Sequence, residues 1–312
     1  MNKEQLTESI SSILHTGKTH GLEVYTCISG NEGRKLKKFV ITDQLKRVLM
    51  DSLDELIEKN FYSDEVELED VANIADNKKS LYNIQLTPEY NPFAFLDDWK
   101  SVNEQYSEDD KNLLMGFFFK MNYNNKYIWA YQQVYPMSMV KKSKNVLAVI
   151  GKNNVYDVLQ SDLVPIANRI DLMIIDGNVI TSNIKLMQNK FKFEKFVRNE
   201  AKETIDYIID MHLLSNTDKL VSYTTKDKLT NAKKLMKAKK SPILKMDRSE
   251  LLEGIKKHSR YSYMIGIENG EIITNTEKEI SSFIKLLNDD IVKSELSQIE
   301  YDSTSKKELE PM

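Results

Sequence analysis

The stretch IDLMIIDGNVITSN, residues 170–183, decides the fold of this chain. Two apolar runs rich in β-branched side chains flank the dipeptide Asp176-Gly177. This dipeptide tolerates the positive φ angles that a two-residue hairpin turn requires. The stretch therefore predicts two antiparallel strands at about 170–175 and 178–183, joined by a tight turn.

Similar signals extend toward the N-terminus. Short runs rich in β-branched and aromatic residues, separated by Asn and Gly, are typical of strands and hairpin turns. Asp43 is expected to cap a helix, because apolar residues from Leu45 to Ile57 recur at 3–4 spacing. The strands expected in this half are 22–30 paired with 35–42, 80–86, 112–122 paired with 126–135 across Asn124-Asn125, 145–150 and 153–159.

From about residue 184 the apolar period becomes helical. Helices are expected at 195–213, with His212 on the buried stripe, at 226–239, from Asp247 onward, and at 276–288, with a small hairpin at 262–274. The predicted fold class is α+β: a mainly antiparallel sheet in the N-terminal half, then a helical C-terminal portion with a small hairpin. The expected divisions are a sheet-rich region 1–183, a helical region 184–300 and a disordered tail 303–312.

Composition excludes several classes of protein. The single cysteine, Cys27, rules out an intramolecular disulfide framework and suits a reducing cytosol. The first residues lack the apolar core of a signal peptide, and the longest apolar runs are too short to span a bilayer. We therefore expect a cytoplasmic protein whose membrane role, if any, comes through a partner.

Two cofactor motifs are incomplete. Gly17-Lys18-Thr19 ends like a phosphate-binding P-loop, but Ser12 stands where that motif needs glycine. The four histidines, His15, His20, His212 and His258, have no metal-type spacing on a shared helix. We expect neither a metal nor an organic cofactor.

Charge is segregated along the chain. The formal net charge is −3, from 44 Lys+Arg and 47 Asp+Glu. Residues 1–110 carry 12 basic and 22 acidic side chains, whereas residues 226–260 carry 12 basic and 4 acidic ones. A polyanion responds to the local field, so a compact basic block inside an acidic protein keeps nucleic acid open as a partner.

The basic block predicts a row of lysines on one helix. On a helix over 226–240, Lys226, Lys233, Lys237 and Lys240 fall within an arc of about 60°, beside an apolar stripe. Such a row can neutralise successive phosphates without reading bases, although lysine rows are also common on solvated surface helices. The candidate DNA-binding residues of this block are Lys226, Lys233, Lys234, Lys237, Lys240, Lys245 and Arg248.

A second basic cluster follows an aromatic strand. Lys141, Lys142 and Lys144 lie in a loop after Tyr135-Pro136 and complete the candidate DNA-binding residues. Alternate positions before it place Tyr127, Trp129, Tyr131 and Tyr135 on one sheet face. Such a face can stack unpaired bases, but it is more commonly part of a core.

A metal-dependent nuclease is the alternative enzyme hypothesis. Asp171 and Asp176 precede Glu200-Ala201-Lys202, which resembles the acidic residues and Glu-x-Lys of many nucleases. However, Glu200 lies within the predicted helix 195–213, and the hairpin turn accounts for Asp176. We therefore expect no catalytic residues.

Two segments carry a family resemblance. IDLMIIDGNVITSNIKLMQNKFKFEKFVRNEA and the later AKKLMKAKKSPILKMDRSELLEGIKKH resemble a bacterial family of unknown function, that of KwaB, the B component of the Kiwa anti-phage defence system. The resemblance covers about 110–290 and the N-terminal third only by length and layout. It implies a cytosolic DNA-binding effector that acts with a small multi-pass membrane protein, the Kiwa A component, against phage DNA.

These observations together predict a non-enzymatic protein that binds DNA without sequence preference and can be recruited to the inner membrane. We also expect a homo-oligomer. The alternatives are the nuclease and a pure interaction module whose basic face contacts a protein or anionic lipid.

Overall fold

The computed structural model describes residues 1–14, 21–30, 33–73, 80–134, 149–152, 155–158, 166–226 and 229–303. The chain divides into two compact units. Unit 1 comprises Met1–Glu69 and Lys78–Leu186, and unit 2 comprises Asp70–Asn77 and Met187–Met312. Residues 70–77 therefore belong with the C-terminal portion, although they lie among the strands of the N-terminal half in sequence.

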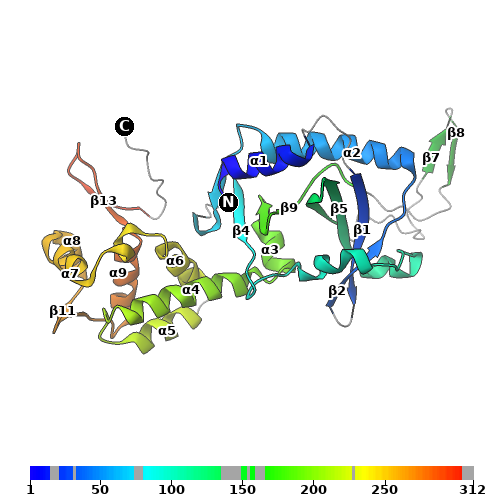
Figure 1. Cartoon of the computed structure of the whole chain (residues 1–312). Coiled ribbons are helices and arrows are strands. Elements are labelled where there is room, and N and C mark those ends of the chain that lie inside the picture. The colour runs from blue at the N-terminus through cyan, green and yellow to red at the C-terminus, as the bar shows by residue number, and fades with distance from the viewer. Residues whose placement is uncertain are drawn as a thin grey trace. The chain divides into compact units, whose positions relative to one another are not determined.

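Unit 1 is built on an eight-stranded sheet (Figure 1). Neighbouring strands from β2 through to β4 are antiparallel. In spatial order the strands are β2 (Gly33–Lys38), β1 (Gly21–Gly30), β5 (Leu114–Tyr123), β6 (Lys126–Gln133), β9 (Leu172–Ile175), β10 (Asn178–Thr181), β4 (Leu81–Gln85) and β3 (Leu68–Asp70). A separate two-stranded sheet joins β7 (Val149–Lys152) to β8 (Val155–Val158). The predicted antiparallel sheet in the N-terminal half is confirmed.

The hairpin that the opening stretch predicts is present. Asp176 and Gly177 have φ angles of 47° and 71°, and Ile175 pairs with Asn178 across the turn. Asn124 and Asn125 turn the β5–β6 hairpin in the same way, with φ angles of 48° and 64°. Positive φ at both central residues matches the right-handed twist of the strands.

Two helices cover one face of the sheet: α1 (Lys3–Leu14) and α2 (Asp43–Ile57), which continues into the π-helical turn η1 (Glu58–Tyr62). Their apolar stripes join one core with alternate residues of the central strands, among them Phe117, Phe119 and Met121 of β5. The cap of α2 differs from the prediction. Thr42 has extended backbone and its Oγ1 accepts from the Leu45 N–H at 3.3 Å, so Asp43 is the first helical residue.

The opposite face of the sheet is also buried. Phe118 of β5 and Tyr131 of β6 are fully buried there, and Phe93 and Phe95 make edge-on ring contacts with Phe118. Phe95 belongs to the 3₁₀ helix η3 (Ala94–Ser101). A second 3₁₀ segment, η4 (Glu108–Leu113), leads into β5. Because both faces are covered, the central strands are apolar in nearly continuous runs.

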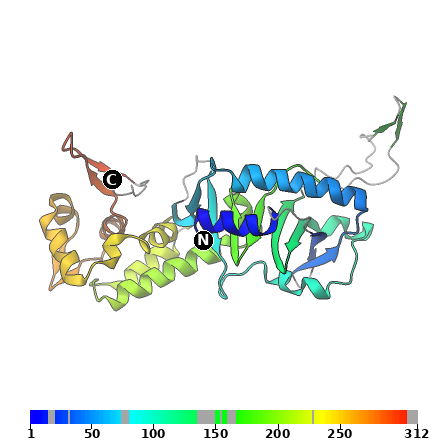
Figure 2. The ribbon, with the colours of Figure 1, turned by 45° about the horizontal axis from the view of Figure 1, so that its top comes forward.

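Unit 2 is mainly helical (Figure 2). It contains most of α3 (Ile184–Lys190), η2 (Val71–Asn73), α4 (Phe193–Asp210), α5 (Thr217–Thr225), α6 (Thr230–Ala238), η6 (Pro242–Lys245), α7 (Arg248–Lys257), α8 (Ser259–Met264) and α9 (Glu277–Leu287). Two small hairpins join β11 (Ile267–Glu268) to β12 (Glu271–Ile272) and β13 (Ile291–Lys293) to β14 (Glu300–Asp302). The predicted cap at Asp247 is confirmed, since its side chain accepts from the Glu250 N–H at 2.9 Å.

The structure corrects two helix predictions. The helix predicted over 226–239 is present only from Thr230: α5 ends at Thr225, and α6 (Thr230–Ala238) begins after Leu229, whose φ of 92° is not helical. His212 is not on a buried stripe, because α4 ends at Asp210 and His212 is exposed with a φ of 49°. In both cases the apolar periodicity continues across a residue whose backbone is left-handed.

Two glycines offer a matched test of this architecture. A Cβ on Gly116, in β5, would lie 2.4 Å from the Gln132 carbonyl oxygen and 2.6 Å from the Tyr131 ring, whereas one on Gly254, in α7, would meet nothing within 4 Å. Gly116→Ala should therefore destabilise the protein by about 2–3 kcal/mol through overpacking. Gly254→Ala should stabilise it by up to about 1 kcal/mol through helix propensity.

Urea denaturation followed by circular dichroism measures both changes. Equal effects of the two substitutions, or a stable Gly116→Ala variant, would contradict the close β5–β6 approach.

Candidate nucleic-acid interface

Helix α6 is held in unit 2 by a buried stripe of Ala232, Leu235, Met236 and Ala238. Lys233, Lys234 and Lys237 flank this stripe and are half-buried, because the methylene stems of lysines next to a packed stripe cover apolar surface. A row of lysines that binds phosphates should be largely exposed, and Lys233 and Lys237 do not meet this expectation. Lys226 and Lys240 are exposed, with 70% and 62% of their side-chain surface accessible.

The two ends of the row pair with acidic side chains. Lys226 caps the C-terminus of α5, not α6, and its Nζ lies 3.7 Å from Glu277 Oε1. Lys240 follows α6 and its ammonium pairs with Asp70. Neither carboxylate was expected from the sequence, because both lie far from the lysines along the chain.

Lys239, which does not belong to the predicted row, pairs with two carboxylates. Its Nζ lies 2.9 Å from Glu200 Oε2 and 2.6 Å from Glu203 Oε2, on the middle of α4. Burial favours the neutral amine, but the hydrogen bonds to Glu203 and Glu200 outweigh it and hold the pKa of Lys239 above its ordinary value. Lys239 therefore links the C-terminal end of α6 to α4 through ion pairs.

The remaining candidates of the basic block are exposed. Lys245 ends η6, and Arg248 begins α7 with its Nη2 donating to the Gly270 carbonyl at 2.8 Å. Both remain available on the surface of unit 2. The loop candidates Lys141, Lys142 and Lys144, like Tyr135, lie outside the described residues.

A basic group that was not predicted as a site lines an open hollow at the α3–α4 junction. This basic hollow has a volume of about 640 Å³ and is lined by Gln188, Asn189, Lys190, Lys192, Glu194, Lys195, Arg198 and Asn199. Lys190, Lys192 and Lys195 are exposed, and no carboxylate in the described part of the chain pairs with them. Arg198 bonds to Glu194 one turn earlier, with Nη2 2.9 Å from Oε1.

The start of α4 adds to the positive field of the basic hollow. Lys192, at the N-cap, has a φ of 53° and no side chain caps this helix. The first turn of this 18-residue helix carries one carboxylate, Glu194, and the Lys195 N–H donates to the Lys192 carbonyl at 2.9 Å, so the partial positive charge of the helix start is compensated only in part. The residues that line the hollow are mainly basic or neutral, with Glu194 as the one carboxylate among them.

The carboxylates of the nuclease hypothesis have structural partners. Asp171 is buried, accepts from the Gln133 N–H at 2.7 Å and pairs with Arg169 at 3.2 Å. Asp176 lies in its hairpin turn, and Glu200 is bound by Lys239. Within the described residues no three His, Cys, Asp or Glu side chains converge as a metal site would require. Asp171 and Glu200 belong to different units.

The aromatic face of β6 is mainly core. Tyr131 is fully buried and Trp129 is 3% exposed, while Tyr127 is 41% exposed. Tyr127 and Trp129 meet edge to face, with ring centroids 6.3 Å apart. Among the described rings of this face, Tyr127 is the most exposed.

Similarity to known proteins extends over most of the chain. Residues 111–297 match the family model described as Kiwa protein KwaB-like. The chain belongs to the KwaB-like family. A family member, the Kiwa protein KwaB of Escherichia coli O55:H7 (strain RM12579 / EPEC), is 22% identical over 320 residues, which cover 99% of this chain and 100% of that protein. No solved structure matches.

Membership of the KwaB-like family confirms the resemblance found in the sequence and makes the chain a component of anti-phage defence. The matched region includes the basic hollow, α6 and the β5–β6 hairpin. Among the described residues, no helix is long and apolar enough to cross a membrane.

The contact between Lys239 and α4 can be tested by a double-mutant cycle. Lys239→Met and Glu200→Gln should each destabilise the protein, and the double variant should be destabilised by less than the sum of the two. The coupling should be about 0.5 kcal/mol, because the pair is partly exposed. Urea denaturation supplies the four free energies of unfolding. Full additivity would show that Glu200 is not engaged by Lys239 in solution.

Proposed function

We propose that this protein is a DNA-binding component of anti-phage defence that holds the phosphate backbone without reading base sequence. The observation that supports it best is the basic hollow. There, three exposed lysines and Arg198 surround the uncapped start of an 18-residue helix, with Glu194 as the single opposing carboxylate among the lining residues.

The predicted lysine row has a smaller part in this proposal than the sequence alone suggested. Lys226 and Lys240 already pair with carboxylates, which lowers the gain from exchanging those partners for a phosphate. Lys245 and Arg248 are exposed and remain secondary phosphate contacts. No base-reading element is required, because phosphate contacts carry affinity but no sequence information.

The family resemblance supports the remaining parts of the proposal. The protein acts with a Kiwa A-type membrane protein that brings it to the inner membrane, and it works there as a homo-oligomer against phage DNA. The local positive field of unit 2 lets an overall acidic protein bind a polyanion, with an affinity that falls steeply as salt rises.

A mobility-shift titration on duplex DNA at several salt concentrations tests which surface binds. Three triple variants make the same change in charge: Lys190/Lys192/Lys195→Glu in the hollow, Lys233/Lys237/Lys240→Glu in the row and Lys141/Lys142/Lys144→Glu in the loop. The hollow variant should bind all sequences more weakly, and to the same degree. Its slope of log affinity against log salt should flatten by about 0.9 for each phosphate that the variant no longer neutralises.

The other two variants serve as charge-matched controls. A collapse of affinity in the row or loop variant, with the hollow variant unchanged, would move the interface to that segment. No mobility shift by the wild-type protein at low salt would leave a protein or lipid interaction module as the function.

The nuclease alternative is tested in the same titration with Mg²⁺ or EDTA. Glu200→Ala and Asp171→Asn should leave DNA binding intact, provided that circular dichroism shows each variant to be folded, because both carboxylates have structural partners. Cleavage that EDTA stops and that either folded variant abolishes would replace the present proposal with a nuclease.

A further inference from the structure

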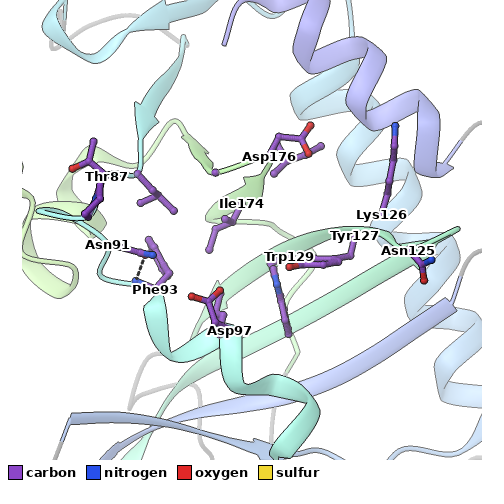
Figure 3. Close-up of a pocket in the computed structure, with 15 residues that line it drawn as sticks. Thr87, Asn91, Phe93, Asp97, Asn125, Lys126, Tyr127, Trp129, Ile174 and Asp176 are labelled. Carbon is purple, nitrogen blue, oxygen red and sulfur yellow. Dashed lines mark hydrogen bonds between the residues drawn. The ribbon is translucent and has the colours of Figure 1, made fainter.

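A second hollow lies in unit 1, at the turn ends of β6 and β9 (Figure 3). This aromatic hollow has a volume of about 570 Å³, within the range of small-ligand and side-chain pockets. Phe93 and Asp97 line one side of it, and Tyr127, Trp129 and Ile174 line another. This hollow has no part in the proposed DNA interface.

Hydrogen-bond donors in the aromatic hollow lack acceptors. Trp129 is 3% exposed; within the described residues its indole N–H has no acceptor, and this nitrogen is not fully buried. The Tyr127 hydroxyl likewise makes no hydrogen bond there. Both donors are open to solvent, so an occupant that offers a carbonyl oxygen to Trp129 replaces solvent with a hydrogen bond, which is a modest net gain.

The charge around the aromatic hollow favours a cation. The carboxylates of Asp97 and Asp176 line it against the single ammonium of Lys126. Asp97 has no ion-pair partner in the described chain, and the Asp176 carboxylate accepts there only from the Ser9 hydroxyl, at 2.5 Å. The first 110 residues, with 12 basic and 22 acidic side chains, add to the negative potential.

The same sheet already binds one cation in this way. Lys120, on the neighbouring strand β5, is 2% exposed; its ammonium lies 3.5 Å from the centre of the Trp99 ring and 2.8 Å from Glu23 Oε1. An aromatic ring and a carboxylate together therefore replace the water shell of that ammonium. The same ammonium also lies 5.5 Å from the centre of the Tyr127 ring. Tyr127, whose ring is 41% exposed, and Asp97 offer the same kinds of group in the aromatic hollow.

We propose that the aromatic hollow binds an arginine side chain from a basic segment of a partner polypeptide. The guanidinium stacks on the exposed face of Tyr127 and donates to Asp97, for which its planar fork is better suited than an ammonium. A backbone carbonyl of the same segment accepts from the Trp129 indole N–H. A free cation pairs with the Asp97 carboxylate but offers no acceptor to the Trp129 indole N–H. An arginine within a peptide provides a cation for Asp97 and a carbonyl oxygen for Trp129.

This proposal is independent of the DNA interface. The basic hollow lies in unit 2 and the aromatic hollow in unit 1. A nucleotide is a poor occupant of the aromatic hollow, because its phosphate would meet the carboxylates of Asp97 and Asp176. A basic segment is instead attracted by these two carboxylates.

Nuclear magnetic resonance of the full chain with ¹⁵N-labelled tryptophan tests the proposal directly. The chain has two tryptophans, so two indole N–H signals are expected, assigned with Trp99→Phe and Trp129→Phe. Titration with the peptide acetyl-Gly-Arg-Gly-amide should shift the Trp129 signal and leave the Trp99 signal in place. The same peptide with citrulline, which keeps the shape without the charge, should bind at least tenfold more weakly.

Asp97→Asn should weaken binding of the arginine peptide at least fivefold, whereas Asp98→Asn, an exposed neighbour that does not line the hollow, should leave it unchanged. Neither variant should alter the mobility shift of DNA. The proposal is overturned if the Trp129 signal does not move at millimolar peptide, if citrulline binds as well as arginine, or if guanosine monophosphate shifts that signal more strongly than the peptide does.

Discussion

Burial of the central sheet on both faces is the constraint on which the rest of unit 1 depends. Phe117 and Phe119 of β5 point into the core beneath α1 and α2, and Phe118 between them points to the opposite, equally buried side. A charged residue that is buried on such a strand needs partners within the protein, and the Lys120 ammonium has them in Glu23 and the Trp99 ring. Polar groups that can bind a ligand are consequently found where the strands end, at the hairpin turns.

In unit 2 the arrangement of ion pairs decides which lysines remain available. The basic block looks uniform in sequence, but Glu200, Glu203, Glu277 and Asp70 are brought to it from other elements. These carboxylates turn part of the block into a packing interface between α6 and its neighbours. The lysines at the start of α4 have no such partners among the described residues, so the positive field is concentrated at a place that the count of charges alone did not indicate.

Local sequence signals predicted the sheet well. The Asp176-Gly177 and Asn124-Asn125 turns, the alternating strands and the Asp247 cap all depend on residues within a few positions of one another. The helix predicted over 226–239 was placed with its start too early, because Leu229 adopts a left-handed backbone that apolar periodicity does not reveal. His212 was misplaced for the same reason at the end of α4.

The candidate sites were less predictable than the fold. The residues of the basic hollow lie in KFKFEKFVR at 190–198, a stretch that contributed only to the family resemblance. Its four basic residues look the same in sequence as those of an ordinary solvated helix face, so the sequence did not indicate a site there. The aromatic alternation of β6 correctly placed Tyr127 and Trp129 on one face, but alternation cannot say which ring is covered. Whether a ring of β6 is covered depends on η3 and the segment before it, which are far from β6 in sequence.

By itself, the sequence determined the α+β class, the hairpin register at Asp176-Gly177, the segregation of charge and the resemblance to the KwaB-like family. Each of these depends on short-range backbone preference or on residue identity. Only the tertiary structure decided that Lys239 and Lys240 are paired, that Lys190, Lys192 and Lys195 line an open hollow, and that the nearly buried Trp129 lines the aromatic hollow. The physical reason is that burial and pairing depend on side chains from segments that are distant in sequence, and local sequence patterns do not indicate which of these segments come together.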